Sequence, residues 1–176
     1  MILFETERLL LREMLPEDYD DLFSMNSDPD VMRYMGDGSV RSREQTMAEL
    51  ERLLSYYVRR PGLGLWATLL KDSYQFVGAS GLVYYDDTLN IGLTFLFAKE
   101  HWNNGYATEV SQALLKYGFE KLGLQKIVCR ASVDNKAAVA VMEKIGMRQV
   151  ENRAAGERIQ VYYELDRKRY KAAGHP

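Results

Sequence analysis

The stretch HWNNGYATE, residues 101–109, stands between a hydrophobic run and the helical pattern YATEVSQALLKYGFEKL. Two asparagines and a glycine, which are turn-forming residues, therefore come directly before a helix. The first amide N–H groups of a helix lack partners, and the helix dipole favours negative charge at that end. Glycine permits close backbone approach, and asparagine tolerates the left-handed conformation, so Asn103 and Asn104 are expected to turn successive N–H groups inward. The stretch predicts an anion-binding turn that suits a phosphate group.

On the C-terminal side of this turn, the apolar spacing alternates between helical and extended patterns. Glycines at positions 123 and 146 are natural helix stops, and Asn135 follows Asp134 as a turn and helix cap. In chain order, the pattern predicts a helix at 107–122, a strand at 126–133, a helix at 136–145 and a strand at 160–165.

On the N-terminal side, apolar runs separated by polar turns predict a three-strand antiparallel meander. Ser42 and Gln45 form a capping box that opens a helix. This helix is expected to bury one side, which carries Met47, Leu50, Leu54, Tyr57 and Val58. The other elements predicted here are a strand at 8–14, a helix at 16–25 and the meander strands at 65–70, 75–85 and 89–97.

The order of these elements predicts an α+β fold. The strands at 89–97 and 126–133 are joined through a helix, which predicts a central βαβ crossover between parallel strands. Short turns join the other strands, so we expect a mixed, mostly antiparallel sheet of about six to seven strands flanked by helices. No repeat, proline-rich linker or low-complexity segment divides the chain, and residues 1–176 are expected to form a single domain.

Composition limits the functional classes. The 176 residues are 47% hydrophobic, and their formal net charge of −2 argues against a broad nucleic-acid footprint. The lone Cys129 excludes an internal disulfide and is expected to be a core thiol. Charges come too early for a signal peptide, and no apolar run approaches about 18 residues. The sequence predicts a cytoplasmic protein with no membrane segment.

Known phosphate and metal motifs do not account for the turn. The chain lacks G-x-x-x-x-G-K-[ST] and G-x-G-x-x-G, which disfavours a Walker nucleoside triphosphatase and a dinucleotide fold. His101 is a candidate base but is expected to be a loop residue, because no neighbouring ligand set accompanies it. His175 lies in a terminal segment without a packing pattern. No metal site is predicted.

The segment FAKEHWNNGYATEVSQALLKYGFEKLGLQKIVCRASVDNKAAVAVMEKIGM, residues 97–147, resembles the GNAT superfamily of acyl-CoA-dependent N-acetyltransferases. The chain looks most like the branch that includes the ribosomal-protein alanine N-acetyltransferases. TERLLLREMLPEDYDDLF (6–23) and SDPDVMRYMG (27–36) precede the segment in the order expected for that branch. The resemblance covers residues 6–165 and implies a GNAT-like domain.

The resemblance implies acetyl-CoA as cofactor, with coenzyme A as product. In such enzymes the quoted turn wraps the pyrophosphate, and the matching residues here are Trp102, Asn103, Asn104, Gly105, Tyr106, Ala107 and Thr108. Backbone around Phe95 and Phe97 is expected to pair with the pantetheine arm as an added strand. Asn135 is similar to the family asparagine that bonds the pantetheine; its other interpretation is a plain helix cap. Asn103 replaces the more usual family glycine.

The chemistry that the resemblance implies is attack of a neutral amine on the thioester carbon. It needs a base, donors that polarise the thioester carbonyl, and a proton for the leaving thiolate. Backbone donors that include Phe97 are expected to polarise the carbonyl. The family often takes the thiolate proton from a serine or a tyrosine, at positions occupied here by Ala138 and Met142, which cannot donate one. Gly92 stands where many relatives carry a carboxylate.

The candidate base is Glu157, in the loop ENRAAGERIQ between the last strands. Ribosomal-type relatives have a glutamate that aligns with it without gaps. Its other interpretation is a solvated hairpin carboxylate, and Glu151 and Asp86 are further candidates. No pattern decides among these carboxylates.

Two functions follow from the resemblance. The first is acetyl transfer, by direct attack in a ternary complex, to a primary amine that is either a protein N-terminus or a small amine. The second is a catalytically weak acyl-CoA-binding sensor or interaction module, which the absence of donors at Ala138 and Met142 favours. Arg33 and Tyr34 are either acceptor contacts or surface and packing residues. A homodimer is a further expectation from relatives.

Overall fold

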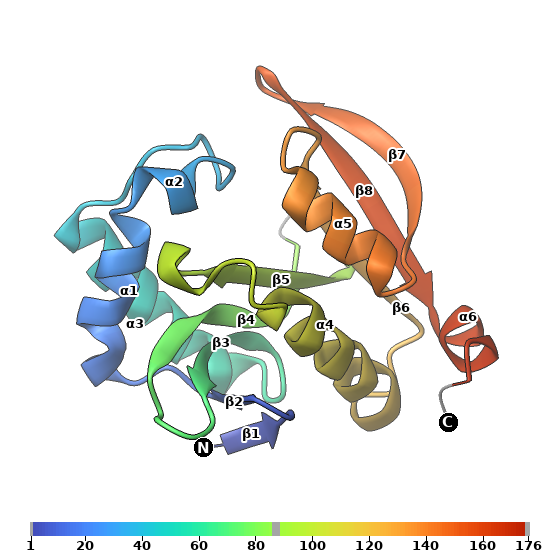
Figure 1. The fold of residues 1–176 in the computed structure, drawn as a ribbon, viewed down its shortest axis with the longest axis horizontal. Helices are drawn as coiled ribbons and strands as arrows, with labels where there is room; N and C mark the ends of the chain where they lie inside the picture. Colours follow the sequence, from blue (N-terminus) through green and yellow to red (C-terminus); the bar gives the residue numbers. More distant parts are fainter. Residues whose placement is uncertain (1, 86–88, 175–176) are drawn as a thin grey trace. The chain divides into compact units, whose positions relative to one another are not determined.

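The computed structural model describes residues 2–85 and 89–174 and has an α+β fold. Its eight strands form one sheet in the order β1-β2-β3-β4-β5-β6-β8-β7 (Figure 1). The α+β class and the mostly antiparallel sheet are confirmed, whereas the expected six to seven strands are too few. The strands that the pattern missed are β1 (Ile2–Glu5) and β7 (Arg148–Ala155). Every residue of β7 is exposed, so it has no apolar alternation to mark it.

The other predicted strands and helices occur in the predicted order, with boundaries that shift by a few residues. The short helices at 29–32, 99–101 and 167–172 were not predicted. The strands are β2 (Leu9–Arg12), β3 (Gly64–Leu70), β4 (Phe76–Tyr84), β5 (Ile91–Phe97), β6 (Lys126–Ser132) and β8 (Arg158–Asp166). The helices are η1 (Pro16–Asp18), α1 (Tyr19–Asn26), α2 (Pro29–Met32), α3 (Arg43–Arg59), η2 (Lys99–His101), α4 (Tyr106–Lys116), η3 (Tyr117–Lys121), α5 (Lys136–Lys144) and α6 (Arg167–Ala172).

The predicted crossover is present. β5 pairs with β6 in parallel, with Gly92 opposite Val128, and α4 lies between these strands in the chain. This connection is what brings the end of β5 directly to the quoted turn and then to the first turn of α4. The predicted meander is also consistent with the sheet, in which β3, β4 and β5 are successive neighbours.

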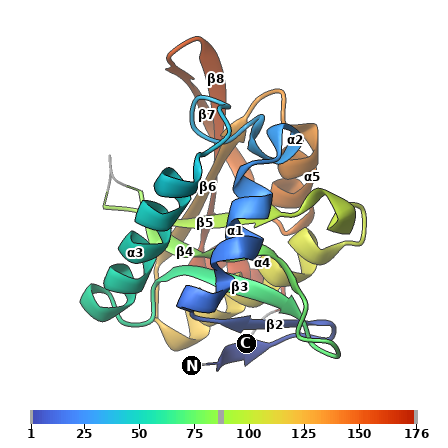
Figure 2. The same cartoon turned by 90° about the vertical axis from the view of Figure 1, so that its left-hand side faces the viewer.

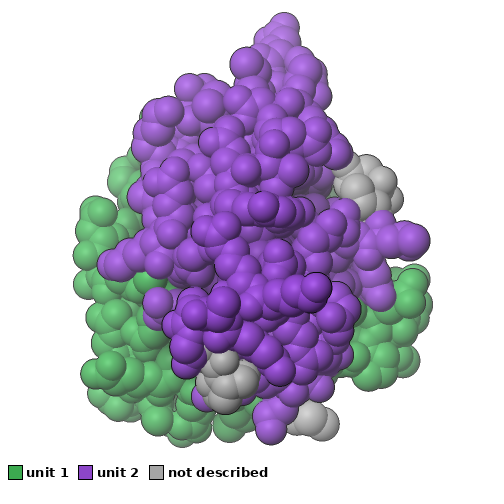
Figure 3. All heavy atoms as spheres, turned by 90° about the vertical axis from the view of Figure 1, so that its right-hand side faces the viewer, with its two compact units in different colours: residues 1–81, 94–110 green, residues 82–93, 111–176 purple. Residues whose placement is uncertain are grey.

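The chain divides into two compact units, coloured separately in Figure 3. Unit 1 contains residues 1–81 and 94–110, and unit 2 contains residues 82–93 and 111–176. The division falls within β4 and β5, so each of these strands contributes residues to both units.

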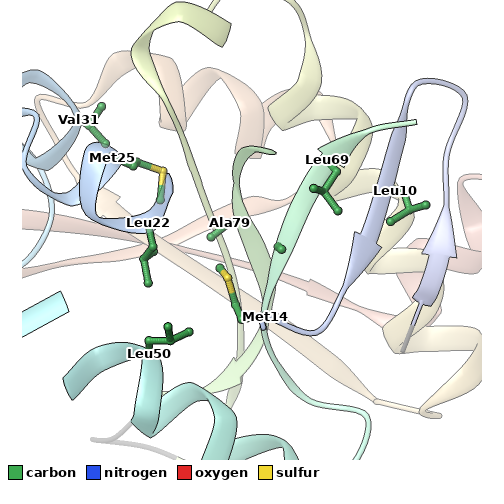
Figure 4. Packing of buried hydrophobic residues seen from close by; sticks show 9 residues of the cluster. Leu10, Met14, Leu22, Met25, Val31, Leu50, Leu69 and Ala79 are labelled. Atoms are coloured by element: carbon green, nitrogen blue, oxygen red, sulfur yellow. The ribbon is translucent and has the colours of Figure 1, made fainter. Parts of the chain in front are cut away.

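Unit 1 packs α1 and α3 side by side on its strands (Figure 2). Ser42 caps α3 by accepting from the Gln45 amide, and the Gln45 side chain accepts from the Ser42 amide, which confirms the predicted capping box. The apolar cluster of this unit, drawn in part in Figure 4, joins strand and helix residues: Leu10, Met14, Leu22, Met25, Val31, Leu50, Ala67, Leu69 and Ala79.

The buried side of α3 differs from the expected one. Leu50 is 2% exposed, whereas Met47 is 41% and Val58 is 82% exposed. Leu54 and Tyr57 pack on the cluster, as expected, and Leu53 joins them. At 3.6 residues per turn, the line through Leu50, Leu53, Leu54 and Tyr57 leaves Met47 and Val58 at its edges, so solvent reaches both.

Unit 2 is built on β6, whose partner β8 runs antiparallel to it from Lys126↔Asp166 to Ser132↔Gln160. β7 pairs with β8 on the outer side, and the register shifts between Gln149 and Glu151. Phe119, 1% exposed, packs on Tyr170 with ring centroids 4.7 Å apart. Among the described residues, no helix is long and apolar enough to cross a bilayer.

Candidate functional site

The turn between η2 and α4 lies in unit 1 and contains two left-handed residues. φ is 60° at Asn103 and 79° at Gly105. The left-handed expectation is therefore right for Asn103 and wrong for Asn104. The Asn104 side chain instead stabilises the turn, because its Nδ2 donates to the carbonyls of His101 and Trp102, each at 3.0 Å.

The backbone amides of residues 103–108 are available to a ligand. Within the described ranges, no carbonyl or side chain accepts a hydrogen bond from any of them. The first bond of the helical type runs from the Glu109 amide to the Gly105 carbonyl, at 3.1 Å. Residues 102–105 are exposed, and 106–108 are half-buried. A run of open amides at the positive end of a helix is the arrangement that holds an anion.

The end of β5 anchors this turn. The Trp102 indole Nε1 donates to the Phe97 carbonyl at 2.8 Å, and the Phe97 ring lies 6.3 Å from that of Tyr106. Phe97 is buried and Phe95 is half-buried. Since Trp102 already occupies the Phe97 carbonyl, a ligand pairing along this strand would use other backbone groups. The cofactor roles expected for Phe95 and Phe97 stay predictions.

Arg8 and Glu109 also support the turn, and the sequence patterns did not single them out. Arg8 was expected at the start of a strand but precedes β2, where it reaches the turn from the loop after β1. Its guanidinium Nη1 donates to the Asn104 carbonyl at 2.9 Å, and its Nε donates to Glu109 Oε2 at 2.7 Å. A signal for Glu109 existed, because an acidic residue in the first turn of a helix beside an expected anion site needs a cation.

In unit 2, Asn135 caps α5. Its Oδ1 accepts from the Ala138 amide at 3.2 Å, which confirms the helix-cap interpretation. Within the described residues no acceptor bonds the side-chain amide nitrogen of Asn135, and a bond from this side chain to the cofactor stays a prediction. Met142 is fully buried and Ala138 is half-buried, and neither can supply a proton.

Tyr85 explains the glycine at position 92. A Cβ built on Gly92 would lie 2.0 Å from Tyr85 Cε1, so the ring fills the space of any side chain there. The Tyr85 hydroxyl donates to the Leu93 carbonyl at 3.2 Å, and the Arg130 guanidinium lies 4.3 Å from the ring centroid. Burial raises the pKa of Tyr85 well above its ordinary value. No local pattern relates residues 85 and 92, which is why the sequence did not reveal this wedge.

Two of the candidate bases, Glu157 and Glu151, lie on the β7–β8 hairpin. Glu157 is exposed in the turn between these strands, and its catalytic role stays a prediction. Glu151 is exposed and forms an ion pair with Arg153. Asp86 and His175 lie outside the described residues.

The remaining candidate residues, Cys129 and His101, do not form a metal-binding group with other described residues. Cys129 is 3% exposed, which agrees with a core thiol, and burial raises its pKa to about 12. His101 ends η2, and its Nε2 is buried without a partner among the described residues. In that same part of the chain, no group of histidine, cysteine and carboxylate side chains could hold a metal ion.

The two residues expected to contact the acceptor, Arg33 and Tyr34, have different surroundings. Arg33 pairs with Asp30 at 2.6 Å, and Lys99 pairs with the other oxygen of that carboxylate at 2.5 Å. Arg33 therefore belongs to an exposed ion-pair network of unit 1, and Tyr34 is half-buried beside it in the chain. Both interpretations of these residues remain open.

Comparisons with known proteins agree on one family. The family model described as acetyltransferase (GNAT) domain matches residues 8–148. YoaA of Bacillus subtilis, described as an uncharacterized N-acetyltransferase, is 30% identical over 150 residues, which cover 84% of this chain and 83% of YoaA. The crystal structure of a GNAT-family acetyltransferase from Bacillus anthracis superposes with a TM-score of 0.84 at 26% identity, covering 96% of this chain and 99% of that one.

A third match concerns the fold alone. The ribosomal L7/L12 alpha-N-protein acetyltransferase RimL, solved in complex with coenzyme A, is 14% identical with a TM-score of 0.80. The match covers 94% of this chain and 98% of RimL. The expected resemblance to the ribosomal-protein branch is consistent with this shared fold.

Proposed function

Because this chain belongs to the GNAT acetyltransferase family, we propose that it transfers the acetyl group of acetyl-CoA to a primary amine by direct attack in a ternary complex. The observation that carries the proposal is the run of open amides at residues 103–108, which begins at a left-handed asparagine and leads into a helix. Relatives described as acetyltransferases do not favour the alternative of an acyl-CoA-binding module without turnover.

The residues of the turn fit the diphosphate of the cofactor. None of these residues carries a carboxylate, and Gly105 lets a phosphate approach the backbone closely: Trp102, Asn103, Asn104, Gly105, Tyr106, Ala107 and Thr108. Phe95, Phe97 and Asn135 are assigned to the pantetheine arm. When bound, acetyl-CoA supplies an activated acetyl group whose carbon–sulfur bond is exchanged for a carbon–nitrogen bond to the amine.

The contribution of the chain to catalysis is mainly positioning. Since Ala138 and Met142 cannot donate a proton, water or the amine itself must provide the proton that the thiol group gains. Backbone donors, the Phe97 amide among them, are assigned to polarise the thioester carbonyl. Glu157 is the proposed base that keeps the amine unprotonated. Glu157 is exposed and therefore accessible to an acceptor that arrives from solvent, whereas Glu151 is already paired with Arg153.

The acceptor is proposed to be a protein N-terminus or a small amine, in the cytoplasm, and the enzyme is proposed to be a homodimer. RimL acetylates a ribosomal protein according to its description, and the shared fold makes a peptide amine the first acceptor to test. Turnover is measured by thiol release from acetyl-CoA over a panel of small polyamines, amino acids and short peptides with free N-termini. Turnover with at least one amine supports the proposal, whereas tight acetyl-CoA binding without turnover on any amine supports the binding module.

A substitution in the turn tests the diphosphate assignment. Gly105→Asp adds a Cβ at a left-handed residue and a negative charge at the open amides, so the affinity for acetyl-CoA should fall about tenfold or more, about 1.4 kcal/mol. Isothermal titration calorimetry measures the affinity. Gly146→Asp is the matched control, because Gly146 is also left-handed, with φ of 86°, and has open space around it. Equal affinity in folded Gly105→Asp and wild-type proteins would remove the turn from the cofactor site.

A further inference from the structure

Arg8 makes contacts to three successive parts of the cofactor turn. Its Nη1 donates to the Asn104 carbonyl at 2.9 Å, its Cζ lies 4.8 Å from the centroid of the Tyr106 ring, and its Nε donates to Glu109 Oε2 at 2.7 Å. Its backbone amide also donates to Glu109 Oε1 at 2.9 Å. An isolated surface ion pair would involve one of these groups, and such pairs contribute little. Here one side chain connects the loop before β2 to the whole turn.

Glu109 brings a negative charge to the place where an anion is expected. It lies in the first turn of α4, and its side chain is 17% exposed. Burial acts to raise the pKa of Glu109, but hydrogen bonds from Thr6 and Arg8 outweigh burial and lower it. The carboxylate is therefore ionised at neutral pH. Without compensation it would repel the phosphates from the same helix end that attracts them.

The donors to Glu109 come from the loop between β1 and β2. Thr6 Oγ1 donates to Oε1 at 2.5 Å, and Arg8 supplies one donor to each oxygen. Within the described residues, the Arg8 guanidinium is the only cation paired with this carboxylate, so Arg8 alone neutralises it by direct contact. The Glu109 carboxylate holds the β1–β2 loop against α4. Because Arg8 neutralises this carboxylate, a phosphate bound nearby is not repelled by it.

The bond to Asn104 fixes the direction of the next amide. In a trans peptide the carbonyl of one residue and the N–H of the next point in opposite directions within one plane. By holding the Asn104 carbonyl, Arg8 turns the Gly105 N–H away from itself, toward the open side of the turn. A lysine cannot replace this geometry, since a single ammonium does not reproduce the planar fork that reaches Asn104 and Glu109 together.

We propose that Arg8 is a positioning residue of the cofactor site, which neutralises Glu109 and fixes the Asn104–Gly105 peptide so that the open amides can bind the diphosphate. This inference rests on the proposed function, because it takes acetyl-CoA as the ligand of the turn. Arg8 acts through the turn, and its substitution should weaken cofactor binding while leaving the chemical step unchanged.

The test compares Arg8→Met, Arg8→Lys, Glu109→Gln and the double variant Arg8→Met/Glu109→Gln. Affinity for coenzyme A is measured by calorimetry, and KM for acetyl-CoA and kcat are measured with the best acceptor. Arg8→Met should weaken coenzyme A binding about tenfold and raise KM similarly, with kcat within about twofold of wild type. Arg8→Lys should lose less affinity than Arg8→Met, because lysine keeps the positive charge beside Glu109. It should not reach the wild-type affinity, because the bond to the Asn104 carbonyl is lost.

The double variant separates neutralisation from plain structural support. If Arg8 compensates the charge of Glu109, removing that charge should restore about threefold or more of the affinity lost in Arg8→Met. If Arg8 only supports the turn through its contacts, the double variant should bind coenzyme A no better than Arg8→Met. That result overturns the neutralising role. Lys71→Met is the matched control, because Lys71 is a partly exposed cation whose side chain pairs with Glu5, at 2.8 Å, and not with Glu109. Its affinity should equal that of wild type.

The proposed function and the role of Arg8 are contradicted by different results. A wild-type protein that does not bind coenzyme A contradicts the proposed function. A wild-type protein that binds coenzyme A, together with a folded Arg8→Met protein of equal affinity, contradicts the inference about Arg8 and leaves the proposed function intact. Melting temperatures of the apo proteins establish that each variant is folded.

Discussion

At the scale of single residues, Asn135 combines a structural role that is visible with a binding role that is proposed. Asn135→Ser should separate them, because serine caps a helix nearly as well but is too short to reach the cofactor. We expect an unchanged melting temperature of the apo protein and a raised KM for acetyl-CoA. Asn135→Ala serves as the comparison, since it loses the cap as well, at about 1 kcal/mol. Parallel loss of stability and binding in Asn135→Ser would leave Asn135 with the cap alone.

The proton chemistry belongs to the same scale. If Glu157 is the base, Glu157→Gln should lower kcat more than it changes KM for acetyl-CoA. The pH profile of wild-type turnover should rise through a single limb set by amine deprotonation, without a fall at high pH, because no protein acid is available at Ala138 or Met142. Stopped assays across pH with two different acceptors measure both quantities.

The control for that experiment is the neighbouring carboxylate. Glu151→Gln removes an exposed carboxylate that is paired with Arg153, and it should leave kcat unchanged. Full activity of Glu157→Gln, or a high-pH limb that persists with several acceptors, would place the proton chemistry on other residues. Ala138→Ser, which installs the family hydroxyl, should raise turnover or leave it unchanged.

At the scale of elements, the capping box at the start of α3 is expected to contribute measurably to the free energy of unfolding. Ser42→Ala removes the side-chain oxygen that accepts from the Gln45 amide, which should lower the free energy of unfolding by about 1 kcal/mol. Chemical denaturation measures the change. Ser39→Ala, three positions earlier, is the control because Ser39 lies outside the helix, and it should cost much less. A loss no larger than that of the control would show that the capping box is not needed to hold α3 on its strands.

The sequence predicted those elements whose signals are local. The capping box of α3, the helix cap at Asn135 and the turn before α4 each follow from residues within one turn of the chain. Val58 shows the limit of periodicity, since the pattern groups it with the apolar side of α3, whereas it lies at the edge of that side and is 82% exposed. β7 shows a second limit: its pairing with β8 supplies the backbone bonds of the strand, and no buried side chain accompanies them.

The site was predictable to the same extent. The open amides at residues 103–108 follow from the sequence of the turn itself. The residues that complete the arrangement come from elsewhere: Arg8 lies on the loop before β2, and Tyr85 fills the space beside Gly92. Such contacts depend on strand neighbours and on packing, which no spacing rule encodes.

At the scale of the whole molecule, the expected single domain stays a prediction with a clear test. β4 and β5 each contribute residues to both units, so neither unit has a complete set of strands of its own. We therefore expect one thermal transition, with equal calorimetric and van't Hoff enthalpies. Differential scanning calorimetry of the apo protein measures both. Two resolved transitions would mean that the units unfold separately.

The pair Tyr85 and Gly92 has a consequence for the ancestry of the chain. A side chain at position 92 would meet the Tyr85 ring at 2.0 Å, and Tyr85 is only 8% exposed in a close-packed interior. In a lineage that carries this tyrosine, a side chain at position 92 requires that the ring move, or be lost first or in the same event. The order of mutations is thus constrained by volume, and the two positions are expected to vary together among descendants of a common ancestor.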